Sequence, residues 1–512
     1  MLRILCAAAI SLLAAWLPSV AAADAIRFEL IGSAEGRLPT ISDDGRWVAF
    51  ESGNEVYVRD RVLGVTTQAS VPNGGTLEES WSGDARISGD GRFVVFRSSV
   101  NLETGVGYLA GGVWVRDLAS GRNELASVPV LGDYPGAWEA AISRDGRFVV
   151  FVSPEPFVAN DVNGDRDVYL RDRVLGKTEV VSLDMAGQPA GYSGGSVSIS
   201  DDSRYVAFTS YSHELVDRYT EMGGVYVRDR LLGTTELVSV NWAGTPVGAY
   251  GGMMSGNGRY VAFLSQFWNM VQGDTNRATD VFVRDRMART TTRVSVTSTG
   301  LQANGGSWST SLSPDGRFVA FISNASNLVP ASDAGREGIF VHDRVSGRTD
   351  FVTSRLPAGN INAAEIDLTA HDGVIDVALA THKALVAEDR DRDIDLYVAE
   401  LSAPGAAYSF TLKPSSIDFG ETPFGSMRTH SFWLRNTGAT ALPLLRVVVR
   451  SGDADMFVAS HACGEFIAPG TGCAIAVNFT PTKVGASTTK LVVVAGNRQV
   501  RERTMVGMGL QP

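Results

Sequence analysis

Short apolar segments, separated by turns of glycine, aspartate and asparagine, dominate the pattern along this chain. One ten-residue stretch, ISRDGRFVVF at 142–151, has near-copies that begin at Ile41, Ile87, Ile199, Met254 and Leu312. Each copy contains an Asp-Gly or related turn, which suits a tight hairpin because glycine readily adopts positive φ. The arginines of consecutive copies lie 46 to 58 residues apart. A period of this size is typical of a solenoid, a propeller or an array.

The content of one repeat predicts four short strands. In the third unit AAIS precedes the turn, RFVVF follows it, and DVYLRD at 167–172 and TEVVSL at 178–183 complete the unit. No unit shows the spacing of apolar residues that marks an amphipathic helix. Four antiparallel strands in each repeat predict the blade of a β-propeller. We expect the apolar positions to face neighbouring blades, while Asp-Gly-Arg makes the turn.

The number of units predicts a seven-bladed propeller over residues 24–402. Six units carry the repeated stretch plainly, and a seventh, at 364–401, supplies three strands but lacks the fourth. The segment IRFELIGS at 26–33 stands before the first unit and resembles the outer strands of the other units. We therefore expect it to complete blade seven and join the two ends of the ring, which would remove exposed sheet edges.

The repeats resemble a known family. SPDGRFVAF followed by IFVHDR is similar to the TolB-type (PD-repeat) propeller repeat, and GDTNRATDVFVRDRMARTTTRVSV is similar to its commoner bacterial form. The resemblance covers about 24–401 and implies a propeller with a binding-type function. TolB carries an α/β domain ahead of its propeller, and this sequence shows none, so a role in envelope transport is not implied. The recurrent VRDR segments are expected to be structural, with the aspartate capping a turn and the arginine pairing between blades.

A second domain is predicted after a linker at 403–408. Residues 409–512 contain short alternating strands with turn signals between them, as in a β-sandwich. The segments FG at 419–420, LRNTG at 434–438 and APGTGC at 468–473, with Cys463, resemble the abnormal-spindle/hydin-like immunoglobulin domain of the choice-of-anchor D type. The resemblance implies an immunoglobulin-like β-sandwich, and no sorting tail supports anchoring. The chain as a whole is thus expected to be all-β.

The first 23 residues predict a secretory signal peptide. Arg3 is their only charge, an apolar run follows it, and the run ends in small residues that suit cleavage after Ala23. A transmembrane anchor is the alternative, and no later stretch is long and apolar enough to span a bilayer. The mature chain keeps Cys463 and Cys473, which predict one disulfide in an oxidising compartment, with two free buried thiols as the alternative. We expect an exported protein, periplasmic or extracellular.

The charge balance limits the partners. The formal net charge is −11, with no basic cluster, which argues against nucleic acid and anionic membranes. We expect a protein or peptide partner, with a glycan as the alternative.

Acidic loops in two blades carry oxygen side chains at every second position, a pattern that suits Ca²⁺. The candidate calcium ligands are Asp161, Asn163, Asp165 and Asp167 in blade three, and Asp389, Asp391, Asp393 and Asp395 in blade seven. Blade five has a thinner version. The sixth position, where a calcium loop of the EF-hand type needs glycine, is arginine or isoleucine. A solvated, Asx-rich turn is the alternative, and apart from Ca²⁺ no cofactor is expected.

Four aromatic residues are expected to crown one end of the propeller channel, on the same side as the acidic loops. They precede the innermost strands, and they are Trp81, Trp138, Tyr250 and Trp308. Such a face could bind a peptide or a sugar, and ordinary packing over the blade ends is the alternative.

Catalytic chemistry finds little support in the sequence. GYSGG at 191–195 fits the Gly-x-Ser-x-Gly pattern, but that pattern needs a strand–turn–helix elbow, and Ser193 lies in a connection between blades. The six histidines lack paired metal-ligand spacing. We predict no catalytic residues and an exported, non-catalytic binding or scaffold protein. A carbohydrate-binding or carbohydrate-active protein is the alternative function, and a propeller lyase or hydrolase is the alternative among enzymes.

Overall fold

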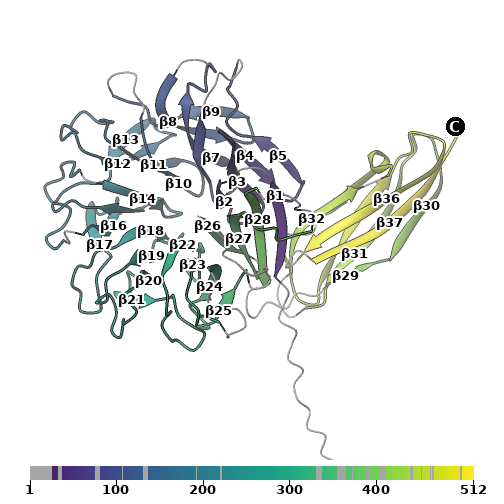
Figure 1. The fold of residues 1–512 in the computed structure, drawn as a ribbon. Coiled ribbons are helices and arrows are strands. Elements are labelled where there is room, and N and C mark those ends of the chain that lie inside the picture. Colours follow the sequence, from purple (N-terminus) through teal and green to yellow (C-terminus); the bar gives the residue numbers. More distant parts are fainter. Residues whose placement is uncertain are drawn as a thin grey trace, which may run out of the picture.

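The computed structural model describes residues 26–511 except for 33–36, 75–80, 106–107, 131–135, 192, 220–221, 330–336, 354–364, 372, 388, 390–392, 403–409, 439–441, 451, 462, 464–465 and 496–498. The predicted signal peptide (1–23) and linker (403–408) lie outside the described residues. The described part is almost entirely β-structure and forms a propeller and a second β-domain (Figure 1).

The described part of the propeller contains seven four-stranded sheets, each with its innermost strand nearest the central axis (Figure 1). We number the blades by chain order. Blades one to three consist of β2 (Arg37–Ile41), β3 (Trp47–Ser52), β4 (Glu55–Asp60) and β5 (Val65–Gln68); β6 (Ser82–Ile87), β7 (Phe93–Val100), β8 (Tyr108–Asp117) and β9 (Arg122–Leu125); and β10 (Ala140–Ile142), β11 (Phe148–Ser153), β12 (Asp167–Asp172) and β13 (Lys177–Val180).

The remaining blades follow the same order, and blade seven takes its fourth strand from the N-terminal segment. They consist of β14 (Ser193–Ile199), β15 (Tyr205–Ser210), β16 (Gly224–Asp229) and β17 (Thr234–Leu237); β18 (Tyr250–Met254), β19 (Tyr260–Ser265), β20 (Asp280–Asp285) and β21 (Thr290–Arg293); β22 (Ser307–Leu312), β23 (Phe318–Ser323), β24 (Gly338–Asp343) and β25 (Thr349–Phe351); and β26 (Ile366–His371), β27 (Val374–Thr381), β28 (Asp395–Ser402) and β1 (Arg27–Gly32).

The core lies between neighbouring blades, where the apolar positions of the repeat meet. Val150 of blade three and Phe208 of blade four, for example, belong to one buried cluster. Within a blade, the last aromatic of the repeated stretch stacks on an aromatic directly opposite in the third strand. Phe151 and Tyr169 are such a pair, with ring centroids 5.6 Å apart. Cross-strand aromatic pairs of this kind stabilise sheets, so the repeated apolar residues have a packing role.

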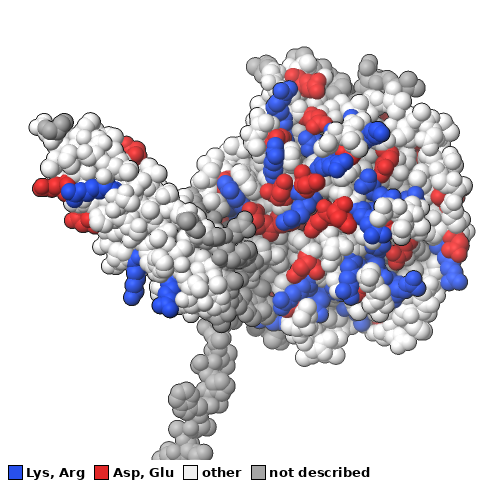
Figure 2. Space-filling view, turned by 180° about the vertical axis from the view of Figure 1, so that it is seen from behind, with Lys and Arg blue, Asp and Glu red and all other residues white. Residues whose placement is uncertain are grey.

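The repeated Asp-Gly-Arg turn also has a structural role. Its arginine forms a two-point ion pair with the aspartate that ends the third strand of the same blade, and that aspartate accepts backbone N–H groups from the next turn. The Nη2–Oδ2 distances lie between 2.6 and 2.9 Å in six pairs: Arg46–Asp60, Arg92–Asp117, Arg147–Asp172, Arg204–Asp229, Arg259–Asp285 and Arg317–Asp343. Viewed from behind, the propeller shows acidic and basic side chains interspersed (Figure 2).

The second arginine of the VRDR segments connects neighbouring blades. Arg173 of blade three reaches Glu124 of blade two at 2.8 Å, and its guanidinium stacks over Phe93. Arg230 and Arg286 make equivalent contacts with a glutamate of the preceding blade. The structure therefore shows both of the expected roles of this segment, turn capping by the aspartate and pairing between blades by the arginine.

In blade seven, β1 pairs with β28 in antiparallel register, with Arg27 opposite Glu400 and Leu30 opposite Tyr397. The segment expected to complete this blade thus forms its outermost strand, over Arg27–Gly32.

One buried arginine fastens blade one to blade seven. Arg61 has no exposed side-chain surface, and its guanidinium lies 2.9 Å from Glu29 of β1, 3.0 Å from Asp376 of β27 and 2.9 Å from Glu400 of β28. The guanidinium also donates to the carbonyl of Gly45. These carboxylates keep the pKa of Arg61 raised despite burial. We call Arg61, Glu29, Asp376 and Glu400 the closure cluster.

The second domain is a sandwich of a four-stranded and a five-stranded sheet around a buried aromatic and aliphatic cluster that includes Phe419, Phe432 and Phe479. The first sheet has the order β29-β31-β35-β33 and the second β30-β37-β36-β32-β34. Its elements are β29 (Phe410–Lys413), β30 (Ser416–Pro423), β31 (Arg428–Asn436), β32 (Leu442–Arg450), the 3-10 helix η2 (Ala454–Met456), β33 (Phe457–His461), β34 (Phe466–Ile467), β35 (Gly472–Phe479), β36 (Gly485–Ala495) and β37 (Gln499–Leu510).

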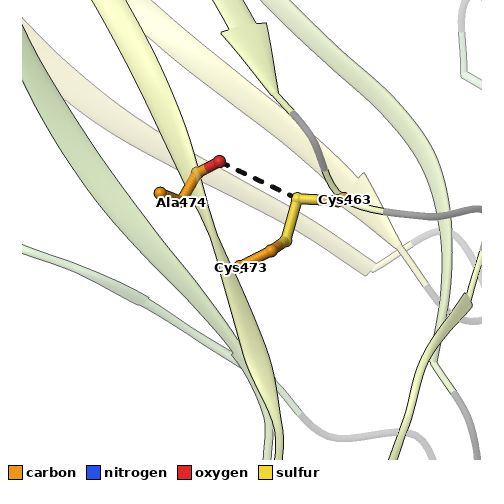
Figure 3. Close-up of a disulfide and its surroundings, with 3 residues drawn as sticks. All are labelled: Cys463, Cys473 and Ala474. Carbon is orange, nitrogen blue, oxygen red and sulfur yellow. Dashed lines mark hydrogen bonds between the residues drawn. A yellow bond between two sulfur atoms is a disulfide. The ribbon is translucent and has the colours of Figure 1, made fainter.

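Cys463 and Cys473 form the predicted disulfide, with their Cα atoms 5.4 Å apart (Figure 3). The register of β33 and β35 pairs His461 with Ile475, and its continuation brings the two cysteines opposite each other. The Sγ of Cys463 lies 4.0 Å from the carbonyl oxygen of Ala474. We treat this as a packing contact, because a disulfide sulfur has no proton to donate.

Replacing Cys463 and Cys473 together by alanine should lower the unfolding free energy of the second domain by roughly 2–3 kcal/mol, because the unfolded chain loses a short cross-link. Denaturant unfolding of the double variant and of oxidised and reduced wild type measures this. Reduced wild type should match the variant. Alkylation and intact mass should find no free thiol in the exported protein, and two alkylated cysteines would contradict the pairing.

Candidate binding site at the channel mouth

The innermost strands are irregular at one repeated position. In β2, β6, β14, β18 and β22 the pairing with the next strand shifts register, as in a β-bulge. The residue three positions before the apolar end of each strand has a positive φ: Leu38 at 51°, Asp84 at 54°, Ser196 at 52°, Gly251 at 72° and Ser309 at 46°. Four of these residues carry a side chain, so the backbone is strained at this level of the channel.

The bulged positions form a ring around one end of the channel. The equivalent residues of blades three and seven, Glu139 and Glu365, directly precede β10 and β26. All seven residues line a cavity of about 500 Å³: Leu38, Asp84, Glu139, Ser196, Gly251, Ser309 and Glu365. We call them the mouth ring. The cavity has a volume in the range of small-ligand pockets. Each blade contributes one residue to the mouth ring.

Negative charge predominates in this cavity. Asp84, Glu139 and Glu365 are its acidic residues and Arg86 is its one basic residue. The backbone N–H of Ser196 donates to the carboxylate of Glu139, which fixes that side chain across the boundary between blades three and four. Behind the ring, Arg97 lies 2.6 Å from Asp84.

Burial and like charge raise several carboxyl pKa values near the ring. Burial raises the pKa of Glu51 to about 7, although this side chain accepts the backbone N–H of Asp84. The pKa of Glu365 is raised mainly by desolvation and further by Asp84 and Glu139, while Arg86 acts in the opposite direction. The field at the channel mouth is therefore negative and only partly neutralised.

The four predicted aromatic residues lie in two different settings. Tyr250 and Trp308 line the cavity; Tyr250 is exposed, and Trp308 packs partly against the buried cluster between blades six and seven. Trp81 is half-buried beneath the guanidinium of Arg97. Trp138 lies under Arg166 at 3.8 Å. Only Tyr250 and Trp308 therefore belong to the cavity wall.

A second set of side chains, three exposed and one half-buried, adjoins the mouth ring, and no sequence pattern predicts it. A Cβ at Gly248 would lie within 2.8 Å of both the ring of Phe267 and the Cβ of Met222, so these two loop residues meet over Gly248. The ring of Tyr211 packs on Gly223 beside Met222. Tyr211, Met222 and Trp268 are 52%, 58% and 69% exposed. We call Tyr211, Met222, Phe267 and Trp268 the aromatic surface.

The acidic loop of blade three is held together by its own hydrogen bonds. Asp167 is fully buried and accepts from Ser182 Oγ at 2.6 Å, from Asn163 Nδ2 at 2.8 Å and from the backbone N–H of Gly191. Asn163 Oδ1 accepts the backbone N–H of Asp165, which makes an Asx turn. The phenol of Tyr169 donates to Asp161, and burial raises the pKa of this phenol.

Blades five and seven repeat parts of this arrangement. In blade five, Asn276 donates to Asp280 at 3.1 Å and accepts the N–H of Ala278, as Asn163 does in blade three. In blade seven, Tyr397 donates to Asp389, and Asp395 is buried at the start of β28. Asp393 is exposed, and Asp391 lies outside the described residues. These contacts favour the Asx-rich turn over a calcium site.

Calcium binding stays a prediction. In the described part of the chain, no group of three or more His, Cys, Asp or Glu side chains is arranged to hold a metal ion. A site with a dissociation constant of about 10⁻⁴–10⁻³ M would raise the unfolding free energy by about 2.7 kcal/mol when the Ca²⁺ concentration is a hundred times that constant. Thermal unfolding in EDTA and in millimolar Ca²⁺ checks this, with the double variant Asp161→Ala, Asp165→Ala as the control. An unchanged transition in wild type would leave the loop as a turn.

The residues considered for catalysis lie in structural settings. Ser193 begins strand β14, and no helix follows this strand in the described residues, so the strand–turn–helix elbow of a serine hydrolase is not present. His342 is buried, contacts Thr349 Oγ1 at 2.9 Å, and has its pKa lowered by burial to about 4. Nothing in the described chain is a helix long and apolar enough to cross a membrane.

Comparison with known proteins gives a family match for the second domain. Residues 409–506 match the family described as HYDIN/CFA65/VesB-like, Ig-like domain. No curated protein matches the chain. Similar solved structures include a protein described as a TolB of Agrobacterium tumefaciens, with 17% identity and a TM-score of 0.35. The match covers 52% of this chain and 87% of that protein.

Two other solved structures are also similar. The WD40 repeats of RRP9 match at 11% identity and a TM-score of 0.43, over 73% of this chain and 97% of that one. The dipeptidyl peptidase 4 of Porphyromonas gingivalis matches at 14% identity and a TM-score of 0.38, over 68% of this chain and 51% of the peptidase. The chain is all-β, with a propeller and an Ig-like domain.

Proposed function

We propose that this chain is an exported, non-catalytic binding protein that holds a protein or peptide partner at the channel mouth. The observation that carries the proposal is the cavity of about 500 Å³ that residues of all seven blades line, with the aromatic surface beside it. Exposed aromatic and methionine side chains are enriched at protein interfaces, and a strained backbone is common at functional sites. The disulfide and the signal-like sequence at 1–23 support export.

A carbohydrate is the second candidate partner, because Tyr250 and Trp268 present exposed rings, and Ser309 and Glu365 line the same cavity as Tyr250. We also propose that the propeller is built from TolB-type repeats, because segments such as SPDGRFVAF resemble that repeat.

The test is selection from a random peptide library displayed on phage, alongside a glycan array, with the purified full-length mature protein. We expect peptides to be enriched on wild type and to be lost on Tyr250→Ala with Trp268→Ala. Trp433→Ala, which removes an exposed tryptophan from the second domain, is the matched control and should keep the enrichment. Enrichment of glycans alone would favour the second candidate, and binding unaffected by the Tyr250/Trp268 variant would place the site elsewhere.

A further inference from the structure

The size of the cavity limits what enters it. About 500 Å³ accommodates one or two side chains of an extended segment rather than a folded surface. The ring residues lie within the innermost strands or directly before them, and the carboxylate of Glu139 accepts the N–H of Ser196. A partner therefore meets preformed groups at the base of the site.

The charge of the cavity selects among side chains. Three carboxylates face one guanidinium within it, and behind the ring Arg97 pairs with Asp84. Glu139 of blade three and Glu365 of blade seven line the same cavity, and the repulsion between them contributes to raising the pKa of Glu365. A cation placed there would relieve this repulsion, whereas an anion would add to it.

The aromatic surface lies beside the cavity, next to Tyr250. Tyr250 lines the cavity, and Gly248, two residues before it, lies under Met222 and Phe267. A chain extending from the cavity past Tyr250 would pass over Phe267 and Met222, and Met222 is more than half exposed. An extended dipeptide spans about 7 Å, so adjacent or alternate side chains can occupy the cavity and this surface together.

We propose that the partner segment is a peptide that places a lysine or arginine side chain in the mouth ring and an aromatic or aliphatic side chain on the aromatic surface. This rests on the proposed function and names its ligand class. Charge complementarity favours a basic peptide over a neutral sugar, because a cation gains Coulomb attraction from the partly neutralised carboxylates of Glu139 and Glu365, whereas a neutral sugar can offer them hydrogen bonds alone.

The test uses pools of acetylated, amidated hexapeptides with one fixed position, either arginine, lysine, glutamate or glutamine, next to a fixed tryptophan. Binding to the full-length mature protein is measured by calorimetry at low and at physiological salt. We expect the arginine and lysine pools to bind at least about tenfold more tightly than the glutamate pool, a preference that falls as salt rises.

In the double variant Glu139→Gln, Glu365→Gln, the ratio of affinities between the basic pools and the glutamate pool should fall by about tenfold. Binding of the glutamine pool should stay unchanged. Glutamine at 139 still accepts the N–H of Ser196, so the strand ends are preserved, and thermal unfolding verifies the fold. Glu502→Gln, on β37 of the second domain, is the matched charge control and should behave as wild type. Tyr250→Ala should weaken all pools.

The outcomes separate the two proposals. Binding of all pools with equal affinity overturns the cationic ligand and leaves a peptide-binding function standing. Binding of no pool, of whatever charge, overturns the peptide-binding function and the inference with it. A preference for basic pools that persists in the Glu139/Glu365 variant overturns the placement in the mouth ring.

Discussion

Replacing Arg61 by methionine should lower the unfolding free energy of the propeller by about 3–5 kcal/mol, because removing one member of a buried ion-pair cluster is strongly destabilising. Asp376 has no exposed side-chain surface; in the variant it would keep His371, whose Nε2 lies 3.0 Å away, but it would face Glu29 and Glu400 without the guanidinium that now lies among them. Methionine keeps most of the side-chain volume, so the loss of stability would measure the effect of removing the charge rather than the effect of creating a cavity. Calorimetry of the mature chain measures it.

The chain offers a matched control for Arg61. Arg173 occupies the same position in blade three, but it pairs with a single glutamate, Glu124, whose side chain is 45% exposed. Arg173→Met should therefore cost no more than roughly 1 kcal/mol. The Cys463/Cys473 double variant, which moves only the transition of the second domain, identifies the propeller transition. Equal effects of the Arg61 and Arg173 substitutions would show that the closure cluster is no stronger than an ordinary contact between blades.

Deleting residues 26–33 should lower the melting temperature of the propeller by roughly 5 °C or more, since a loss of several kcal/mol has an effect of this size in a large domain. The deletion exposes the edge of β28, removes Glu29 from the closure cluster, and uncovers the apolar residues against which Phe28 and Leu30 pack. Differential scanning calorimetry of the truncated chain measures the shift.

A synthetic peptide with the sequence of residues 26–33 supplies the control for this deletion. Added in excess, it should pair with the free edge of β28 and restore part of the lost stability, while a scrambled peptide should not. A truncated chain that melts at the wild-type temperature would mean that β1 contributes nothing to holding the ring together.

Much of the fold was predictable because it depends on local patterns. The alternation around RFVVF, the Asp-Gly turns and the spacing of the repeats predict blades, and the missing fourth strand at 364–401 points to the N-terminal segment. The strand pairing agrees with each of these inferences. The disulfide was predictable for the same reason, because its two cysteines lie close in sequence.

The site was less predictable because it depends on groups brought together from distant parts of the chain. Leu38 and Ser309 adopt a positive φ without the glycine that usually marks it. Tyr211 and Trp268 lie in different loops, and only folding brings these loops to one surface. Arg61 has the same sequence context as Arg173, and its distinct role arises because Asp376 and Glu400 follow it by more than 300 residues.

The pairing of β1 with β28 has a consequence for synthesis. Residue 27 leaves the ribosome near the start of translation, but its partner at 400 is made some 370 residues later. The first strand must therefore wait, unpaired, while six blades and most of the seventh are produced, and contacts this distant in sequence form slowly. A chain that cannot finish its fold until its last blade exists stays open throughout its production, which suits transport through a narrow pore before folding.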